Sequence, residues 1–396
     1  MPSSILYIVS SWPCGRSFGG QIRSYHIGCA LKEVGPVSVL MVGADADDAE
    51  ARELTSREFT VLPPIKPVLR PNRGVVEKLR WAVDPNYLNL HGFVAPEADQ
   101  RRVLQYRQEH ALTWVLNSRT ANILQIPHWP GAHLDIDDIP STYLRSRAAS
   151  DLSAIGRLKS RVQQGLWRRR ELRFKQRFTT VSVCSDEDRR YLNGGDTVHV
   201  IPNGFARPAK VPVRSVDPHH PRIGFVGLYS YAPNREGVRW FLRECWPAIQ
   251  RAIPGVRFRL MGKDTNGPDA PSDLGVDALG WVADPAEEIS TWSAMVIPIR
   301  FGGGTRIKIA DAFSRKCPVV STSLGAFGYA VEDGRQLRLA DEPAAFAQAC
   351  IDLARKPAEG NALAERAWSE FLDKWTWDAI APRVRRAAED CLQRKG

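Results

Sequence analysis

Cysteine is sparse in this chain of 396 residues, and no two cysteines form a Cys-x-x-Cys pair. The seven cysteines are scattered, and their odd number excludes a complete set of intrachain disulfides. Such usage fits a reducing compartment, so we expect a cytoplasmic protein.

Long apolar runs are also missing from the sequence. No stretch approaches the roughly 18 apolar residues that a membrane-spanning helix needs. The start, Met1–Ser10, has no cationic leader and reads as a first β-strand rather than a signal peptide. The eight histidines include no His-Glu-x-x-His pattern, so no metal site is predicted from them.

Positive charge is present in excess but is concentrated in one segment. The net charge is +10, and residues 145–177 alone hold eleven basic and two acidic residues. A nucleic-acid-binding surface would distribute basic residues more widely, so we do not expect nucleic acid as a partner.

Short β-branched runs alternate with helical patterns along the chain, which predicts parallel sheets with crossover helices. We therefore expect an α/β protein with two Rossmann-like, doubly wound domains facing each other across a cleft. A proline-rich stretch at 206–221 predicts a linker between domains 1–205 and 222–375, followed by a C-terminal helix at 376–396. The expected strands include Ile5–Val9, Ile123–Ile126, His133–Asp137, Arg222–Val226, Met295–Ile299 and Val319–Thr322.

A glycine-rich turn follows one of the buried strands, which ends near Arg300. Gly302, Gly303 and Gly304 would let the backbone approach a ligand closely. A helix is expected to begin near Thr305, whose hydroxyl would cap it. Free N–H groups at such a helix start favour an anion.

Two cations stand where the helix dipole disfavours them. Arg306 and Lys308 fall in the predicted first turn, at a cost of about 0.3–1 kcal/mol each. A phosphate above the glycine turn would reverse that sign. The alternative is that Lys308 pairs with Asp311 on an exposed face and Arg306 is merely solvated.

Four motifs in order resemble a known family. They are Ser17–Arg23 (Ser-Phe-Gly-Gly-Gln-Ile-Arg), Val198–Gly204 (Val-His-Val-Ile-Pro-Asn-Gly), Gly224–Asn234, and Gly302–Phe313 with Cys317–Gly325. Together they resemble the GT-B glycosyltransferases of family 4, the group 1 retaining enzymes, in the branch with a Gly-Gly-Gly-Thr-Arg loop. Residues 44–119 match none of its motifs.

The resemblance implies sugar transfer from a nucleotide sugar held by the second domain to an acceptor held by the first, with no cofactor. Arg306 and Lys308 would hold the diphosphate and stabilise the leaving nucleotide. Asp311 aligns with a glutamate that holds the ribose. The remaining donor-binding residues implied are Gly19, Gly20, Gly227, Gly302, Gly303, Gly304, Thr305 and Phe327.

The sequence departs from the family pattern in places. Gly303 stands where a sugar-binding glutamate is usual, and Asp311 is shorter than glutamate. Phe327 occupies another position that is often glutamate, so either Phe327 or Tyr329 packs on the nucleotide, or both are core aromatics.

Acidic residues lie at the end of the expected strand His133–Asp137. The resemblance to the corresponding family segment implies that Asp137 and Asp138 lie on the acceptor side, where one could accept a proton from the acceptor hydroxyl or polarise the sugar. Two alternatives remain: a structural turn, and a metal-binding Asp-x-Asp formed by Asp135 and Asp137.

The basic segment 157–177 reads as an amphipathic helix, because Leu158, Val162 and Leu166 recur every four residues. It predicts peripheral contact with an anionic membrane, at the inner face of the cell membrane. The alternatives are a solvated helix face and contact with nucleic acid, against which the few aromatic side chains for base stacking count. The acceptor would be a carbohydrate or a lipid-linked sugar, in cell-surface polysaccharide or glycoconjugate synthesis. A nucleotide-sugar epimerase of the same fold and a non-catalytic sugar-nucleotide-binding protein remain as other hypotheses.

Overall fold

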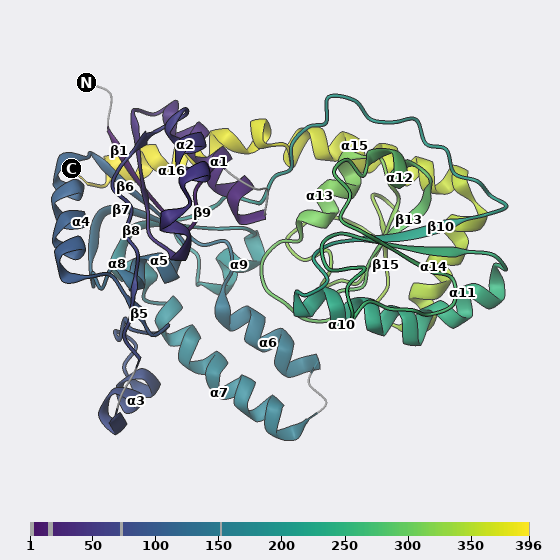
Figure 1. Cartoon of the computed structure of the whole chain (residues 1–396), viewed down its shortest axis with the longest axis horizontal. Coiled ribbons are helices and arrows are strands. Elements are labelled where there is room, and N and C mark those ends of the chain that lie inside the picture. The colour runs from purple at the N-terminus through teal and green to yellow at the C-terminus, as the bar shows by residue number, and fades with distance from the viewer. Residues whose placement is uncertain (1–3, 15–18, 72–73, 151–152, 396) are drawn as a thin grey trace. The chain divides into compact units, whose positions relative to one another are not determined.

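The computed structural model describes residues 4–14, 19–71, 74–150 and 153–395. Its contacts group into two compact units (Figure 1). The first comprises Met1–Arg145, Ser153–Asn203 and Ile380–Gly396, and the second comprises Ser146–Leu152 and Gly204–Ala379. The last helix therefore belongs by its contacts to the first unit. Residues 206–221, predicted as a linker, contain no helix or strand.

The first unit is built on a seven-stranded parallel sheet in the order β3-β2-β1-β6-β7-β8-β9. Its strands are β1 (Ile5–Val9), β2 (Val37–Met41), β3 (Thr60–Val61), β6 (Leu112–Leu116), β7 (Trp129–Asp135), β8 (Phe178–Val183) and β9 (Val198–Val200). β1 and β6 are buried along their whole length. Central strands of a parallel sheet are covered on both faces, which explains why these strands are buried without interruption.

Helices cover this sheet, and a small antiparallel pair, β4 (Val68–Leu69) with β5 (Phe93–Val94), extends from it. The helices are α1 (Gly19–Lys32), α2 (Ala49–Ser56), α3 (Gly74–Val83), α4 (Glu97–Glu109), α5 (Ser118–Ile123), α6 (Pro140–Ser150), α7 (Ala154–Glu171), α8 (Phe174–Arg177), α9 (Asp186–Tyr191) and α16 (Trp377–Gln393), with a 3-10 turn at Ala44–Asp47. α6 begins in the first unit and ends in the second.

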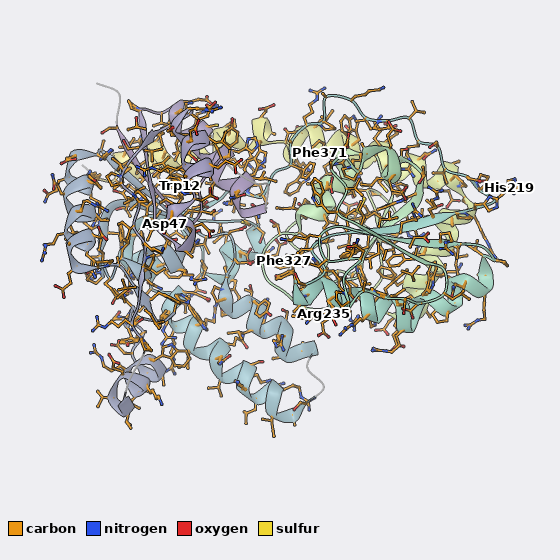
Figure 2. All side chains as sticks on the ribbon, viewed as in Figure 1. Trp12, Asp47, His219, Arg235, Phe327 and Phe371 are labelled. Carbon is orange, nitrogen blue, oxygen red and sulfur yellow. The ribbon has the colours of Figure 1, made fainter. Side chains whose placement is uncertain are left out.

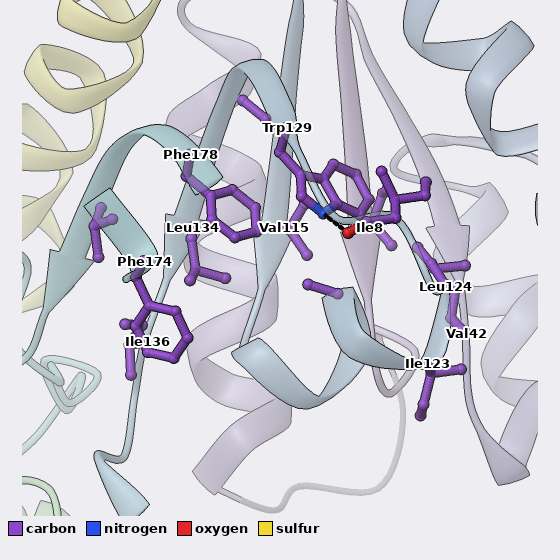
Figure 3. Close-up of a cluster of buried hydrophobic side chains, with 14 of the residues drawn as sticks. Ile8, Val42, Val115, Ile123, Leu124, Trp129, Leu134, Ile136, Phe174 and Phe178 are labelled. Carbon is purple, nitrogen blue, oxygen red and sulfur yellow. Dashed lines mark hydrogen bonds between the residues drawn. The ribbon is translucent and has the colours of Figure 1, made fainter. Parts of the chain in front are cut away.

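The core of the first unit joins strands to the segments that connect them (Figure 3). Trp129 stacks on Phe178 with ring centroids 5.6 Å apart, and its indole N–H donates to the Ile126 carbonyl at 3.0 Å. Burying rings of this size contributes about 1.5–3 kcal/mol each, which stabilises the pairing of β7 with β8.

The second unit has a six-stranded parallel sheet in the order β12-β11-β10-β13-β14-β15. Its strands are β10 (Arg222–Val226), β11 (Arg257–Met261), β12 (Val276–Gly280), β13 (Trp292–Ile297), β14 (Val319–Ser321) and β15 (Arg338–Leu339). Its helices are α10 (Ala232–Trp240), α11 (Trp246–Ala252), α12 (Ala286–Ser290), α13 (Ile307–Ser314), α14 (Pro343–Arg355) and α15 (Pro357–Lys374), with a π-helical turn at Phe241–Cys245.

The prediction of an α/β protein with two Rossmann-like units is confirmed. One predicted strand is wrong: Ile123 ends helix α5, and Leu112–Leu116 forms the strand instead. The reason is local. Asn117 caps α5, and its side chain accepts from the Thr120 N–H at 2.9 Å, which starts a helix before the apolar run that resembled a strand.

Candidate functional site

The topology of the second unit points to one end of its sheet. The chain order of the strands reverses between β10 and β13, and ligands of doubly wound folds bind outside the carboxyl ends of the strands at such a point. Gly227 follows β10 there, and Gly302–Gly304 follow β13. Of the predicted glycines, Gly227 and Gly302–Gly304 are therefore placed at the same end of this sheet, whereas Gly19 and Gly20 begin α1 in the first unit.

The glycine turn needs its glycines. Gly302 has a φ of 141° and Gly304 a φ of 67°, conformations that other residues adopt only with strain. A Cβ on Gly302 would also lie 2.6 Å from Nη2 of Arg306. The Arg306 guanidinium folds back over the turn and donates through Nη1 to the carbonyls of Gly303 and Gly304, the latter at 2.8 Å. Arg306 is thus half-buried and bonded, not freely solvated as in the alternative interpretation.

The start of α13 differs from the prediction. The helix begins at Ile307, with Arg306 as its N-cap residue and no side-chain hydrogen bond at the cap. The predicted cap by Thr305 is therefore wrong: Thr305 is buried within the turn, one residue too early to cap the helix. Lys308 is consequently the second residue of the helix, where its cation meets the positive end of the dipole.

Lys308 lies against the end of β10. A Cβ on Gly227 would lie 2.9 Å from both Cε and Nζ of Lys308, so a larger residue there would displace the end of this side chain. The ammonium lies 5.4 Å from the centroid of the Phe225 ring. Burial and the Arg306 charge lower the pKa of Lys308 to about 8, against a smaller opposing effect of Asp311.

The alternative in which Lys308 pairs with Asp311 is wrong. Asp311 is 9% exposed and instead accepts from Nε of Arg315 at 2.7 Å, one helical turn further along. Among the residues that the structure describes, Lys308 makes no ion pair. The Lys308 ammonium is thus a partly buried cation that is not paired with a carboxylate of the described residues and lies next to a glycine turn. Such a group favours the binding of an anionic ligand.

The two aromatic candidates differ. Tyr329 is buried, with its ring centroid 4.4 Å from that of Trp375, and it belongs to the core. Phe327, labelled in Figure 2, is half-buried on the loop after β14. Phe327 is therefore the one of the two that a ligand could reach.

The sequence analysis missed a backbone contact between Gly262 and Gly227. Gly262 follows β11 with a φ of 129°, and a Cβ there would lie 2.2 Å from the Gly227 carbonyl oxygen. The two backbones touch directly. A Gly after each of two adjacent strands is a signal that could have identified this contact from the sequence.

The first unit carries a buried polar network at the carboxyl ends of β7 and β8. Arg23, which is 1% exposed, donates to Asp135 through Nε at 3.0 Å and Nη2 at 2.6 Å. It also donates to Oδ1 of Asn203 at 2.9 Å and to the Ile201 and Pro202 carbonyls. Burial is the largest single effect and lowers the pKa of Arg23, but Asp135, Cys184 and Asp137 together outweigh burial and raise that pKa above its ordinary value. Sequence analysis had not singled out Arg23, although it is the one Lys or Arg in α1 before the last residue.

This network reaches one of the predicted acceptor-side residues. Nδ2 of Asn203 donates to Oδ1 of Asp137 at 2.6 Å, and the Cys184 thiol lies 3.4 Å from the same oxygen. Asp137 is half-buried and Asp138 is exposed. Arg23 therefore connects α1, which begins at the predicted Gly19 and Gly20, with the carboxylate of Asp137 through Asn203. Ser17 and Phe18 of the predicted loop lie outside the described residues.

The metal alternative for Asp135 and Asp137 finds no geometric support. Asp135 has both oxygens on Arg23, and Oδ1 also accepts from Ser182 at 2.6 Å. Within the described residues, no three His, Cys, Asp or Glu side chains gather as metal ligands would.

Glu171 is a second buried acid, and it contacts the start of α6, just after Asp137 and Asp138. Its carboxylate accepts from the Ser141 N–H at 2.8 Å and from the Ser141 hydroxyl, which fixes the start of α6 just after Asp137 and Asp138. Burial raises the pKa of Glu171 to about 7 in spite of these hydrogen bonds.

Comparisons with known proteins agree with this geometry. Residues 220–356, which include Gly227 and the glycine turn, match the family model described as Glycosyl transferases group 1. The chain is 26% identical over 215 residues to an uncharacterized 44.6 kDa protein in the cps region of Klebsiella pneumoniae. That alignment covers 50% of this chain and 55% of the relative, so it spans about half of the relative's length.

Solved structures share the fold across nearly the whole chain. HepE of Anabaena in complex with UDP and glucose has a TM-score of 0.61 and 14% identity, with 97% of this chain and 98% of that chain covered. Sucrose-phosphate synthase of Thermosynechococcus elongatus has a TM-score of 0.65 and 15% identity, with the same coverage. The fold is thus that of the GT-B glycosyltransferases, and the family match supports a group 1 glycosyltransferase domain in the second unit. Over the described part of the chain, no helix has the length and apolarity to cross a bilayer.

Proposed function

We propose that this protein is a retaining glycosyltransferase of the Gly-Gly-Gly-Thr-Arg branch of GT-B family 4, which uses a nucleoside diphosphate sugar without a metal or cofactor. The observation that carries the proposal is the Lys308 ammonium, which lies against Gly227 at the end of β10 and makes no ion pair among the described residues. A diphosphate would supply the missing negative charge. UDP, which is bound in the HepE structures, is the first nucleotide to test.

In the proposed reaction, residues of the second unit bind the donor and residues of the first unit activate the acceptor. The bond between the anomeric carbon and the β-phosphate oxygen breaks, and a bond from that carbon to the acceptor oxygen forms. Lys308 and Arg306 stabilise the charge that collects on the departing diphosphate. Asp137 or Asp138 accepts the proton that the acceptor hydroxyl loses. Asp311 and Phe327 would contact the nucleoside, and the glycines at 302–304 and 227 would admit the phosphates.

The test of the donor is a thermal-shift panel of UDP-, GDP-, ADP- and dTDP-sugars, followed by measurement of nucleotide release with candidate acceptors. Stabilisation by one donor and acceptor-dependent release would support the proposal. Release of a free epimerised sugar nucleotide without an acceptor would indicate an epimerase, and binding without release would indicate a non-catalytic protein. Activity should survive EDTA, because side-chain cations take the place of a metal ion.

Replacing Arg306 by alanine should lower kcat/KM at least about tenfold, the effect of losing roughly 1.4 kcal/mol of transition-state stabilisation. Steady-state kinetics with the identified donor would measure this. Lys316→Ala is a control just after the same helix, since Lys316 is bonded to Glu365 at 2.8 Å and not to a residue of the site. Near-normal kinetics of Arg306→Ala would remove Arg306 from the site.

Donor binding should also depend on pH through Lys308. Its lowered pKa of about 8 means that the free protein loses this positive charge as the pH rises through 8. Binding of the diphosphate then requires proton uptake, so the Kd for UDP should rise by up to about tenfold per pH unit above pH 8 and level off below pH 7. Isothermal titration in buffers of different ionisation enthalpy would measure both effects. A flat profile from pH 7 to pH 9 would contradict this assignment.

For the acceptor and the biological role, we propose a carbohydrate or lipid-linked acceptor in cell-surface polysaccharide synthesis. The relative from the cps region supports a role in capsule synthesis. The basic residues 157–177 would bring the protein to an anionic membrane at the inner face of the cell membrane, where such acceptors are assembled. α7 and α8 bear out the predicted helical conformation of this segment.

A further inference from the structure

Exposed apolar side chains of the first unit gather on two segments. Of the sixteen large hydrophobic side chains that are exposed among the described residues, seven lie between 68 and 93 and three lie on α7. The first of these segments falls within residues 44–119, the part of the chain that matches none of the motifs above. Soluble proteins rarely gather exposed apolar side chains in this way without a partner.

Helix α3 turns its apolar face outward. At about 100° per residue, Val75, Val76, Leu79 and Val83 fall on one stripe roughly 100° wide. They are 59–81% exposed, and no described residue of α3 is buried. A helix that packed on the core would bury this stripe, so α3 presents to its surroundings the face that helices normally hide.

The opposite face of α3 is held by α7. Arg170 of α7 is 5% exposed, donates through Nη2 to the Trp81 carbonyl, and lies 5.4 Å from the centroid of the Trp81 ring. The attachment explains the orientation, because Trp81 projects from the side of the helix away from the apolar stripe. Figure 1 shows α3 at the end of the stem formed by β4 and β5, away from the parallel sheet of its unit.

Helix α7 adds a second apolar stripe and positive charge. Ile155, Leu158 and Val162 recur at i, i+3 and i+7 and are 57–82% exposed. The helix has six basic residues and one acidic residue, and Lys159 and Arg161 are exposed. Apolar stripes flanked by cations match the apolar boundary and the anionic headgroups of a lipid bilayer.

We propose that α3, its β4–β5 stem and α7, together called the apolar lobe, form a bilayer-docking surface: the stripe of α3 enters the acyl boundary and the cations of α7 contact anionic headgroups. The proposal extends the electrostatic contact of residues 157–177 by an insertion element that lies elsewhere in the sequence. It does not depend on sugar transfer. A protein partner is a poorer match, because the outward stripe of α3 consists of valine and leucine and lacks the Trp, Tyr and Arg that dominate protein interfaces.

The test is co-sedimentation of the full-length protein with vesicles of phosphatidylcholine containing roughly one third phosphatidylglycerol. Val76→Glu/Leu79→Glu should weaken binding at least about tenfold. The matched control is Val213→Glu/Leu274→Glu, which places the same two charges at positions that are 90% and 87% exposed in the second unit, and which should bind like the unsubstituted protein. Arg157→Gln/Lys159→Gln/Arg161→Gln should remove the salt-dependent part of the binding.

Several results would overturn the proposal. The first is that the unsubstituted protein does not bind these vesicles. The second is that the Val76→Glu/Leu79→Glu variant binds them as well as the control does. The third is that size-exclusion chromatography with light scattering shows a dimer of the unsubstituted protein that is absent in this variant. Because Val76, Leu79, Val213 and Leu274 are exposed, the two glutamate double variants should unfold like the unsubstituted protein, which circular dichroism would verify. UDP binding by the same variants should be unchanged, so a failure of vesicle binding and a failure of donor binding can be told apart.

Discussion

Replacing Lys308 by methionine should weaken UDP binding by about 10- to 150-fold, the effect of losing one charge-assisted interaction of roughly 1.5–3 kcal/mol. Methionine keeps most of the side-chain length that fills the space beside Gly227, so the change removes the charge and little else. In the transferase reaction, kcat/KM should fall further than binding does, because the leaving diphosphate carries more charge in the transition state.

Two measurements make the Lys308 result specific. Uridine lacks the diphosphate, so its affinity should not change in Lys308→Met. Lys316→Met is the matched control, because Lys316 lies just after the same helix and is bonded to Glu365 at 2.8 Å. Equal UDP affinity for Lys308→Met and Lys316→Met would mean that the diphosphate binds elsewhere. Lys308→Met should also abolish the pH dependence of UDP binding above pH 8.

Replacing Arg23 by methionine should destabilise the first unit by roughly 3–5 kcal/mol, because Asp135 would keep a buried charge with no cation beside it, bonded only to the Ser182 hydroxyl among the described residues. For a unit of this size, such a loss corresponds to a fall in Tm of roughly 6–20 °C. Thermal and urea unfolding would measure it.

The controls for Arg23 come from the same unit. Arg57→Met removes an exposed arginine that pairs with Glu53, and it should cost at most about 1 kcal/mol. Arg23→Met/Asp135→Leu removes both charges and should recover much of the lost stability. If Arg23→Met and Arg57→Met had equal effects, the network would not stabilise the fold as the hydrogen bonds indicate.

Much of the donor-side arrangement could be predicted from sequence because it depends on short segments. Gly302–Gly304, Arg306 and Lys308 are close together in the chain, and a strand–turn–helix pattern places them at one edge of a parallel sheet. The N-cap was predicted one residue too early because the choice between Thr305 and Arg306 depends on the backbone conformation of the turn. The partner of Asp311 was missed because an arginine four residues later competes with a lysine three residues earlier.

The network in the first unit could not be predicted in this way. Arg23, Asp135 and Asn203 are separated by 112 and 180 positions, and only the packing of α1 against the ends of the strands brings them together. The outward orientation of the apolar face of α3 could not be predicted from the sequence either. An apolar stripe in a sequence predicts a buried helix face, and only the structure reveals that this one is exposed.

The course of the C-terminal helix decides how the protein can be divided. Ile380, Val384, Ala387 and Cys391 of α16 are fully buried in the first unit, although the chain reaches them only after completing the second. His199 of β9 bonds to Asp390 at 3.0 Å, and Lys395 donates to the Ala111 carbonyl at 2.8 Å. A fragment ending at residue 203 would therefore expose the apolar surface that these four side chains cover, and we expect the N-terminal half to fold alone as a fusion that joins it directly to the final seventeen residues.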